Sequence, residues 1–322
     1  MDHFIPEISV VSSIYTSERY GHLISMVESV NQQRGSGIEV VVVIERVNEV
    51  FEQLTADMRR IRIPITIVFS RSKLGISRAR NIGVEYARGR FVSFVDDDAL
   101  VMPGWSKTLV HTFNCHPEAI GVTGPTLPKW EHDLDGWFPQ ELFWAIGCSA
   151  WKGLEGERET DYAWGANMSF RREIFINCSF RDAFTSGAHR RGKTGPVGDD
   201  VEFSLAAKRR SGGKIIFNPG VEVLHWVPSF KTKGSFVRGY AFWQGYSDAR
   251  FKSDNKAPMD RLRVEYQVFT RIIRRLLPEI VRDLVFRHRV GLKKSSIVLQ
   301  ATAFFGLGYF RFLWTKTIQK PR

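Results

Sequence analysis

The stretch SRARNIGVEYARGRFVSFVDDD, residues 77–98, joins a helical pattern, a glycine and an apolar run that ends in three aspartates. Residues 77–87 have helical spacing, and Gly89 is suited to end that helix. Phe91–Asp96 is predicted to form a strand, because its apolar residues form a short continuous run. A helix joined to such a strand by a short connection is typical of a parallel α/β sheet.

The same alternation runs through the first 125 residues. Further strands are predicted at 8–13, 39–45 and 65–70, and further helices at 20–33 and after Asn48. The run EVVVVIE at 39–45 is typical of a strand that is buried on both faces. We therefore predict an α/β fold, a Rossmann-like, mostly parallel sheet flanked by helices, with ligands beyond the carboxyl ends of the strands.

Charge is distributed unevenly along the 322 residues. The net charge is +12, and residues 251–322 alone hold 16 basic and 5 acidic side chains. With 43% hydrophobic residues, the chain is not predominantly disordered. We expect the basic C-terminal segment to contact an anionic partner.

The predicted C-terminal segment, 251–322, is a helical extension. At helical spacing, four arginines align on one side, opposite apolar residues: Arg271, Arg275, Arg282 and Arg289. Pro278 is expected to kink this helix. Ser295–Phe310 is uncharged but shorter than the about 18 to 20 residues that span a bilayer. These features predict peripheral attachment to an anionic membrane surface. One alternative is a helical subdomain packed on the body, and another is a nucleic-acid arm, which the apolar face and the near-neutral body disfavour.

The three aspartates are a candidate metal site. Strand alternation would point Asp96 and Asp98 to one side and Asp97 away. Neighbouring carboxylates repel one another unless a cation is bound, and their oxygens suit Mg²⁺ or Mn²⁺. A solvated acidic turn is the alternative interpretation.

An ordered series of motifs resembles family 2 glycosyltransferases with a GT-A fold over residues 5–250. The motifs are PEISVVSSIY (6–15), VVVVIE (40–45), the stretch from Gly75 to Trp105, WGANMSF (164–170), FRDAF (180–184) and GDDVEF (198–203). The resemblance implies a GT-A domain at 1–250, with a nucleotide-binding half at about 1–125 and an acceptor half at about 126–250. WGANMSF would form a substrate-proximal loop.

The resemblance also implies site residues for the donor and a divalent metal, Mn²⁺ or Mg²⁺. Asp98 would bind the metal with help from Asp96 and His225, and Asp96 and Asp97 would also lie near the nucleotide. Arg80 and Asn81 would line the nucleotide pocket. Glu45 stands where the family has an acidic residue that holds uracil, although the usual second acid is missing here.

In the same family the GDDVEF position supplies the general base, which assigns Asp200 here, with Asp199 orienting the acceptor or sharing that role. The alternative is that both aspartates begin a helix at 201–210, where a helix dipole favours acids. Both interpretations can hold together.

The implied activity is inverting transfer of a sugar from a nucleoside diphosphate sugar, with UDP favoured, to a polyprenyl phosphate or lipid-linked saccharide. The motifs, with HWVP at 225–228, most resemble glucuronosyltransferases that act on glucosyl-dolichyl phosphate. A sugar nucleotidyltransferase is the alternative enzyme, but it usually has a glycine-rich basic loop where this chain has SSIYTSERY (12–20). No nucleic-acid partner is expected.

Two further features concern location and a misleading motif. Three cysteines without C-x-x-C spacing and no basic-apolar leader predict the cytoplasmic face of the cell membrane. Residues 187–194 match the phosphate-loop pattern G-x-x-x-x-G-K-T, but no apolar strand precedes them. We therefore interpret them as a basic loop.

Overall fold

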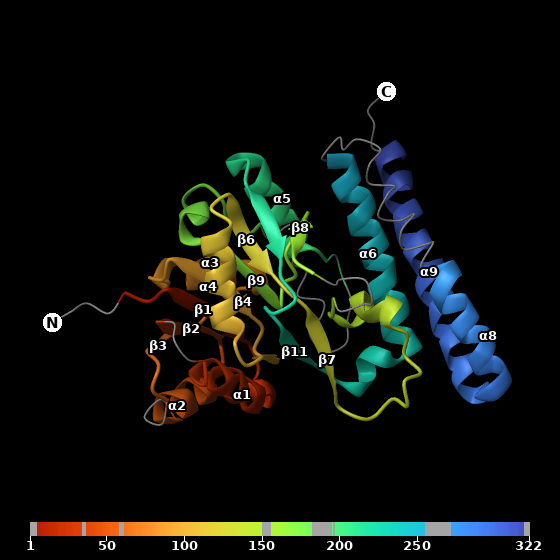
Figure 1. Cartoon of the computed structure of the whole chain (residues 1–322), viewed down its shortest axis with the longest axis horizontal. Helices are drawn as coiled ribbons and strands as arrows, with labels where there is room; N and C mark the ends of the chain where they lie inside the picture. Colours follow the sequence, from red (N-terminus) through yellow and green to blue (C-terminus); the bar gives the residue numbers. More distant parts are fainter. Residues whose placement is uncertain are drawn as a thin grey trace. The chain divides into compact units, whose positions relative to one another are not determined.

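A computed structural model describes residues 5–33, 37–57, 61–149, 156–181, 195, 197–254 and 272–318. The loop at 187–194, Trp151 and Arg271 lie outside these residues. The chain divides into two compact units (Figure 1). Unit 1 comprises residues 1–129, 153–185 and 199–226, and unit 2 comprises 130–152, 186–198 and 227–322.

Unit 1 is built on an eight-stranded sheet with the order β3-β2-β1-β4-β9-β6-β10-β8 (Figure 1). The first four strands are parallel: β1 (Ile8–Ile14), β2 (Ile38–Glu45), β3 (Ile65–Ser70) and β4 (Phe91–Val95). They confirm the predicted strands to within one residue at each end. Four parallel strands place their carboxyl ends, and the residues that follow them, at one edge of the sheet.

The other half of this sheet is mixed. It contains β6 (Ala119–Thr123), β8 (Arg158–Thr160), β9 (Asn167–Arg171) and β10 (Lys214–Phe217). β6 and β10 are parallel, whereas β9 runs antiparallel to β4 and β6, and β8 antiparallel to β10. Asn167–Arg171, expected as part of a loop, is thus a central strand. Its buried apolar residues Met168 and Phe170 pack in the core, which overrides the loop prediction.

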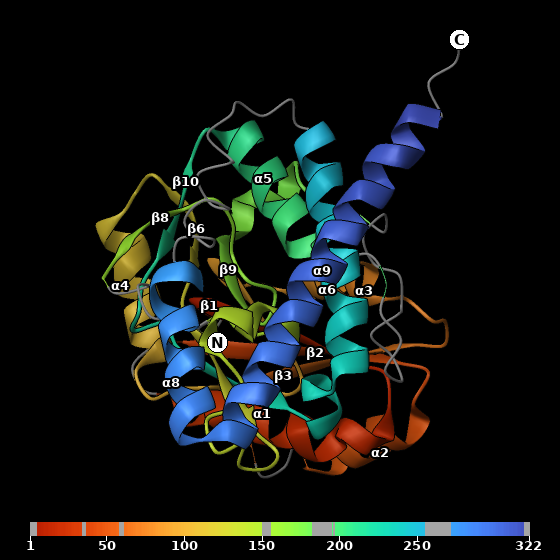
Figure 2. The same ribbon diagram turned by 90° about the vertical axis from the view of Figure 1, so that its right-hand side faces the viewer.

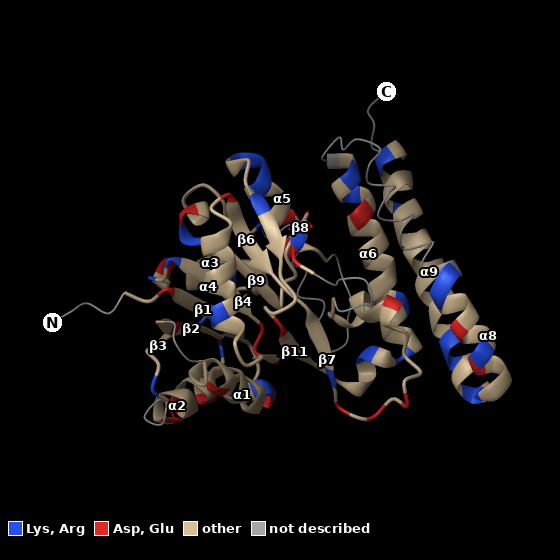
Figure 3. Cartoon of the chain, in the orientation of Figure 1, with Lys and Arg blue, Asp and Glu red and all other residues tan. Residues whose placement is uncertain are grey.

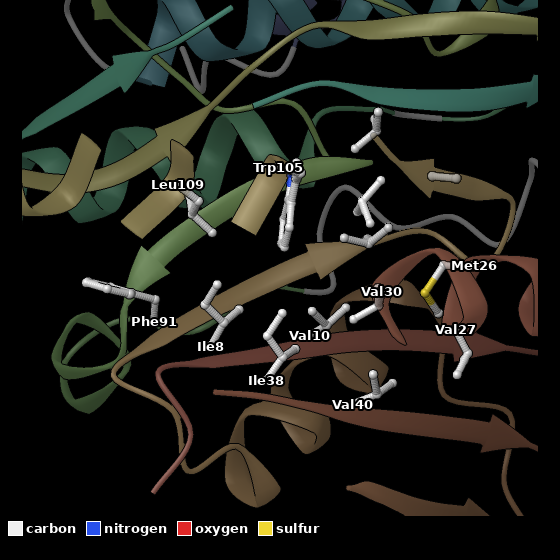
Figure 4. Packing of buried hydrophobic residues seen from close by; sticks show 14 of the residues in the cluster. Ile8, Val10, Met26, Val27, Val30, Ile38, Val40, Phe91, Trp105 and Leu109 are labelled. Carbon is white, nitrogen blue, oxygen red and sulfur yellow. The ribbon is translucent and has the colours of Figure 1, made fainter. Parts of the chain in front are cut away.

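Helices cover both faces of the sheet in unit 1. Alternate residues of β2 divide between two cores, with Val40 and Val42 in one and Val41 in the other. The first core packs against α1 (Tyr20–Asn31), α2 (Asn48–Asp57) and α4 (Trp105–Cys115) (Figure 4). The second packs against α3 (Ile76–Tyr86), α5 (Asp199–Ser211) and the 3₁₀ turn η4 (Arg172–Ile176).

A three-stranded sheet, β5-β11-β7, holds the acidic turn next to a histidine. β5 is Ala99–Val101, β7 is Thr126–Trp130 and β11 is Val223–Val227. The backbone N–H of Ala99 donates a hydrogen bond to the backbone carbonyl of Asp96. The three aspartates therefore lie in a turn after β4, not on the strand. β11 runs antiparallel to β5 and pairs His225 with Ala99. This pairing brings His225 next to the acidic turn, although His225 and Ala99 are 126 positions apart in the chain.

Unit 2 contains a bundle of long helices. They are α6 (Gly234–Asp254), α8 (Leu277–Phe286) and α9 (His288–Ile318), with 3₁₀ helices at η3 (Gln140–Ile146) and η7 (Ser229–Thr232). α9 runs alongside α6 (Figure 2). A side chain on Gly308 would lie 1.8 Å from the carbonyl oxygen of Phe242, so these two backbones meet where only glycine fits.

The amphipathic pattern predicted around Pro278 is partly covered in the structure. Leu276 and Ile280 are buried, whereas Arg275 and Arg282 are exposed. α8 packs along α9, and Ile280 is buried there, whereas Leu277, Val281, Val285 and Phe286 of α8 stay exposed. Pro278 lies in the first turn of α8, directly after a π-helical segment at Ile272–Leu276, where a missing N–H is tolerated.

α9 has a second, uncovered side. Its buried residues are Gly291, Lys294, Ile297, Ala301 and Gly308. Large apolar side chains are exposed elsewhere on the helix: Leu292, Leu299, Leu307, Phe310, Leu313, Trp314 and Ile318. Figure 3 shows lysine and arginine on α8 and toward the ends of α9. By length and composition, α9 is the one helix among the described residues that could cross a membrane.

Candidate active site

Asp96, Asp98 and His225 converge at the edge of unit 1. One potential ligand atom from each lies within 4.8 Å of the others. Asp98 and His225 are buried, and His225 Nε2 lies 3.3 Å from Asp98 Oδ1. Carboxylate oxygens and an imidazole nitrogen are common ligands of divalent metals, so these residues fit a divalent cation. The spacing of the side chains follows from the turn after β4 and from the pairing of β5 with β11.

Arg19 lies against the same acidic turn. It follows β1 in the 3₁₀ turn η1 (Ser17–Arg19) and contacts Asp97 Oδ1 at 2.9 Å and Asp98 Oδ2. Burial raises the pKa of Asp97 above its usual range, although Arg19 opposes that shift. Burial alone would lower the pKa of Arg19, but Asp97 and Asp98 raise it. The Arg19 guanidinium thus supplies the positive charge that faces Asp97.

A second acidic pair lies at the start of α5. Asp200 Oδ2 accepts a hydrogen bond of 2.8 Å from the backbone N–H of Gly165, just before β9. Burial and the neighbouring charge of Asp199 raise the pKa of Asp200 to about 6, against the opposing effects of Arg80 and of two backbone N–H groups. A carboxylate with a pKa in this range suits a general base near neutral pH.

Arg80 joins the two acidic groups. Its guanidinium contacts Asp199, lies 3.5 Å from Asp96 Oδ1 and donates a 3.1 Å hydrogen bond to the carbonyl of Gly165. It is 6% exposed and lies over the rings of Phe94 and Phe180 at 5.9 and 5.4 Å. Arg80 is therefore fixed between the metal-site end and the base end of the site.

A small cavity opens between β1, α3 and β4. It is lined by Val11, Ser12, Ser13, Ile76, Arg80, Phe94, Val95 and Asp96. Two of the predicted nucleotide-binding residues, Arg80 and Asp96, are in this set. The cavity lies at the carboxyl ends of adjacent parallel strands, where α/β sheets bind ligands.

Two other predicted residues have partners away from this cavity. The Glu45 carboxylate accepts hydrogen bonds from the backbone of Leu74 and Gly75, at 2.9 and 3.2 Å, and so holds the loop before α3. The Asn81 amide makes a reciprocal pair of 2.9 Å hydrogen bonds with the backbone of Phe180. In this structure both side chains position the chain around the site and do not line the cavity.

Sequence reasoning missed Arg19 and Gly165. Arg19 lies soon after the carboxyl end of β1, where polar residues of a parallel sheet are candidates for ligand binding. Gly165 is close to two functional side chains: a methyl group there would lie 3.1 Å from Arg80 Nη2 and 3.3 Å from Asp200 Oδ2. Its role depends on a contact between distant segments, which a single sequence does not reveal.

Comparisons with known proteins agree with this arrangement. The sequence model of "Glycosyl transferase family 2" matches residues 9–178. The glucosyl-dolichyl phosphate glucuronosyltransferase of Haloferax volcanii is 30% identical over 241 residues, which cover 75% of this chain and 76% of that protein.

Solved structures share the fold. A mannosyltransferase from Pyrobaculum calidifontis, in complex with GDP-Man and Mn²⁺, matches with a TM-score of 0.62 at 16% identity, covering 98% of this chain and 89% of its own. The S. aureus TarS fragment in complex with UDP-GlcNAc matches with a TM-score of 0.51 at 17% identity, covering 73% and 65%. These matches confirm the predicted GT-A fold, and the family match favours a glycosyltransferase over a sugar nucleotidyltransferase or a non-enzymatic binding protein. The chain belongs to glycosyl transferase family 2 and is a glycosyltransferase.

Proposed function

We propose that this chain is an inverting, metal-dependent glycosyltransferase that moves a sugar from a UDP-sugar to a hydroxyl or phosphate of a polyprenyl-linked acceptor. The observation that carries this proposal is the pairing of two distinct acidic groups by Arg80. One group, with His225, has the ligands for a metal, and the other contains the buried Asp200 with a raised pKa. Direct displacement is assisted by a base that takes the acceptor proton and by a cation that stabilises the departing diphosphate.

Asp98, Asp96 and His225 would hold the divalent cation, Mn²⁺ or Mg²⁺. When bound, it supplies positive charge that stabilises a departing diphosphate. The mannosyltransferase from Pyrobaculum calidifontis contains Mn²⁺, which supports this choice of cofactor. We propose that the nucleotide binds at the mouth of the small cavity between β1, α3 and β4, next to Arg80 and Asp96.

Asp200 is the proposed general base. The acceptor oxygen attacks the anomeric carbon of the donor sugar from the face opposite the diphosphate, while Asp200 takes the proton from that oxygen. The new carbon–oxygen bond forms as the bond to the diphosphate oxygen breaks, and UDP leaves with the bonding electrons. Because the raised pKa makes Asp200 a better proton acceptor, its burial serves this role. Asp199, held by Arg80, is proposed to orient the acceptor.

A lipid-linked acceptor is supported by the relative from Haloferax volcanii, whose name specifies glucosyl-dolichyl phosphate. The uncovered apolar residues of α9 and the arginines and lysines around them give unit 2 a surface suited to anionic lipid. We propose attachment at the cytoplasmic face of the membrane through this surface.

Transfer of labelled sugar tests the proposal. The full chain is incubated with Mn²⁺, vesicles containing glucosyl-dolichyl phosphate, and one labelled nucleotide sugar at a time, including UDP-glucuronic acid, UDP-GlcNAc and GDP-mannose. We expect lipid-extractable label with a UDP-sugar, and none with Asp200→Asn or with chelator. Transfer only from a GDP-sugar would contradict the UDP assignment, and unchanged transfer by Asp200→Asn would contradict the proposed base.

A further inference from the structure

Asp98 shares its carboxylate between two partners. Its Oδ1 lies 3.3 Å from His225 Nε2, and its Oδ2 is contacted by Nη2 of Arg19. The same guanidinium uses Nη1 to contact Asp97 Oδ1 at 2.9 Å. Arg19 thus spans two consecutive carboxylates on one side, while the other oxygen of Asp98 faces the metal-site histidine.

We propose that Arg19 is a positioning residue for the metal site: its guanidinium holds Asp98 Oδ2 and thereby directs Oδ1 toward Asp96 and His225. This inference rests on the metal site proposed above. Arg19 has no assigned role in the proposed site, and it acts through Asp98 without being a metal ligand itself. Hydrogen-bonded partners of metal ligands commonly fix the orientation of those ligands.

The backbone of Arg19 is held in place for this role. The residue ends η1 and immediately precedes α1, whose packed face includes Leu23 and Met26 at 0% exposure. Its guanidinium also lies 5.8 Å from the ring centre of Tyr15, and its side chain is 27% exposed. The approach direction of the guanidinium is therefore set by the folded core of unit 1.

Arginine suits this position better than lysine. A planar guanidinium presents several N–H donors in a fixed fork and can contact two carboxylates at once, whereas an ammonium group is a single point charge. Asp97 and Asp98 are 3% and 7% exposed, so their mutual repulsion is poorly screened by water. Arg19 offsets that repulsion and keeps the two groups apart in fixed directions.

Removal of Arg19 has two opposing effects on a metal site. The site becomes more negative, which favours any cation, but Asp98 loses the partner that fixes its direction. Loss of such outer partners typically weakens metal binding by about 10- to 100-fold. We expect the lost orientation of Asp98 to weaken metal binding more than the added negative charge strengthens it. The reason is that Asp97 and Asp98 would repel one another without the Arg19 guanidinium between them.

Binding of Mn²⁺ alone to the full chain tests the inference without any turnover. Free Mn²⁺ is followed by its electron paramagnetic resonance signal during titration, for the wild type, Arg19→Met, Arg19→Lys and Asp98→Asn. Arg90→Met is the matched control, because it also removes one arginine charge, from a half-exposed side chain whose partner is Glu7 at 3.9 Å. Circular dichroism and melting temperature establish that each variant is folded.

We expect the wild type and Arg90→Met to bind Mn²⁺ equally and Asp98→Asn to lose binding. Arg19→Met should bind Mn²⁺ about 10-fold or more weakly than the wild type. The affinity of Arg19→Lys should lie between those of the wild type and Arg19→Met. Equal or tighter binding by Arg19→Met, with binding lost in Asp98→Asn, overturns the inference and leaves the proposed metal site standing. If Asp98→Asn binds Mn²⁺ as strongly as the wild type, or if the wild type binds no Mn²⁺, both the inference and the proposed metal site are overturned. If Arg19→Met fails to fold, Arg19→Lys decides by the same comparison.

Discussion

Arg80 donates a hydrogen bond to Asp199 across 119 positions of sequence. The contact joins α3, beside the nucleotide-side cavity, to the first turn of α5, which carries the proposed base. Burial and Asp199 raise the pKa of Asp200 to about 6, whereas Arg80 opposes that rise. One buried cation therefore links the donor side of the site to the acceptor side.

Replacement of Asp200 by asparagine keeps the shape of the side chain and removes its basicity. General-base assistance contributes typically about 10²- to 10⁴-fold, so we expect kcat to fall by about that factor. UDP affinity, measured by calorimetry, should stay within about twofold, because Asp200 does not line the cavity between β1, α3 and β4. A variant that keeps wild-type kcat would show that another group takes the proton.

The pH dependence of kcat/KM follows from the same carboxylate. Asp200 must be deprotonated to act as a base, and its pKa is about 6, so activity should decline about tenfold per pH unit below that value. Arg80 lowers this pKa. Arg80→Met should therefore move the acidic limb of the profile to higher pH, besides weakening donor binding.

The comparison variant for this profile is Arg78→Met, which removes an arginine from the same helix. Its acidic limb should coincide with that of the wild type. If the acidic limb of Arg80→Met lies at the same pH as that of the wild type, or at lower pH, the assignment of this limb to Asp200 is contradicted.

A buried ion pair is predicted to stabilise the α8–α9 hairpin. Lys294 Nζ lies 2.5 Å from Glu279 and 2.6 Å from Asp283, and Lys294 and Asp283 are each 2% exposed. Removing one partner of such a pair typically costs about 3–5 kcal/mol, because the other charge stays buried and unpaired. Lys294→Met should therefore lower the free energy of unfolding in urea by about that amount.

Lys293→Met serves as the control for this measurement, because Lys293 is its neighbour on α9 and is exposed. It should unfold within about 0.5 kcal/mol of the wild type. The double variant Lys294→Met/Asp283→Leu should recover much of the loss. A Lys294→Met variant as stable as the control would show that the pair contributes little.

Membrane attachment is predicted to depend on the uncovered side of α9. Phe310 is 69% exposed on that side, and burial of a phenylalanine is worth about 1.5–3 kcal/mol. Phe310→Glu should weaken binding to anionic vesicles about tenfold or more in a flotation assay. Ile176→Glu changes an 80% exposed apolar residue of η4 in unit 1 and should bind like the wild type. Equal losses in both variants would argue against a specific role of α9.

The nucleotide half of the fold could be predicted from sequence because its signals are local. Short apolar strands and helices with clear ends follow one another, and the predicted strand at 65–70 matches β3. Asp96, Asp98 and His225 were also predicted, and the antiparallel pairing of β11 with β5 explains why they meet. The position of β9 was missed because sequence does not show which strands it lies between.

Contacts between distant segments account for the other differences. The predicted contact of Glu45 with uracil stays a prediction; in the structure the Glu45 carboxylate accepts hydrogen bonds from the backbone N–H groups of Leu74 and Gly75, which the sequence did not reveal. Local periodicity placed Ile280 on the apolar side of α8, where it is buried, but did not reveal that Leu277, Val281, Val285 and Phe286 stay exposed. The uncharged stretch of 16 residues, Ser295–Phe310, lies inside the 31-residue helix α9, whose ends carry charged residues.

Calorimetric titration of UDP into the wild type and Asp98→Asn, first with Mn²⁺ and then with chelator, tests whether donor binding depends on a metal held by Asp98. We expect UDP to bind the wild type only with Mn²⁺, and to bind Asp98→Asn about tenfold or more weakly, because this variant loses the buried carboxylate beside His225. Binding of UDP that is unaffected by chelator and by Asp98→Asn would contradict a metal-dependent donor site built on Asp96, Asp98 and His225.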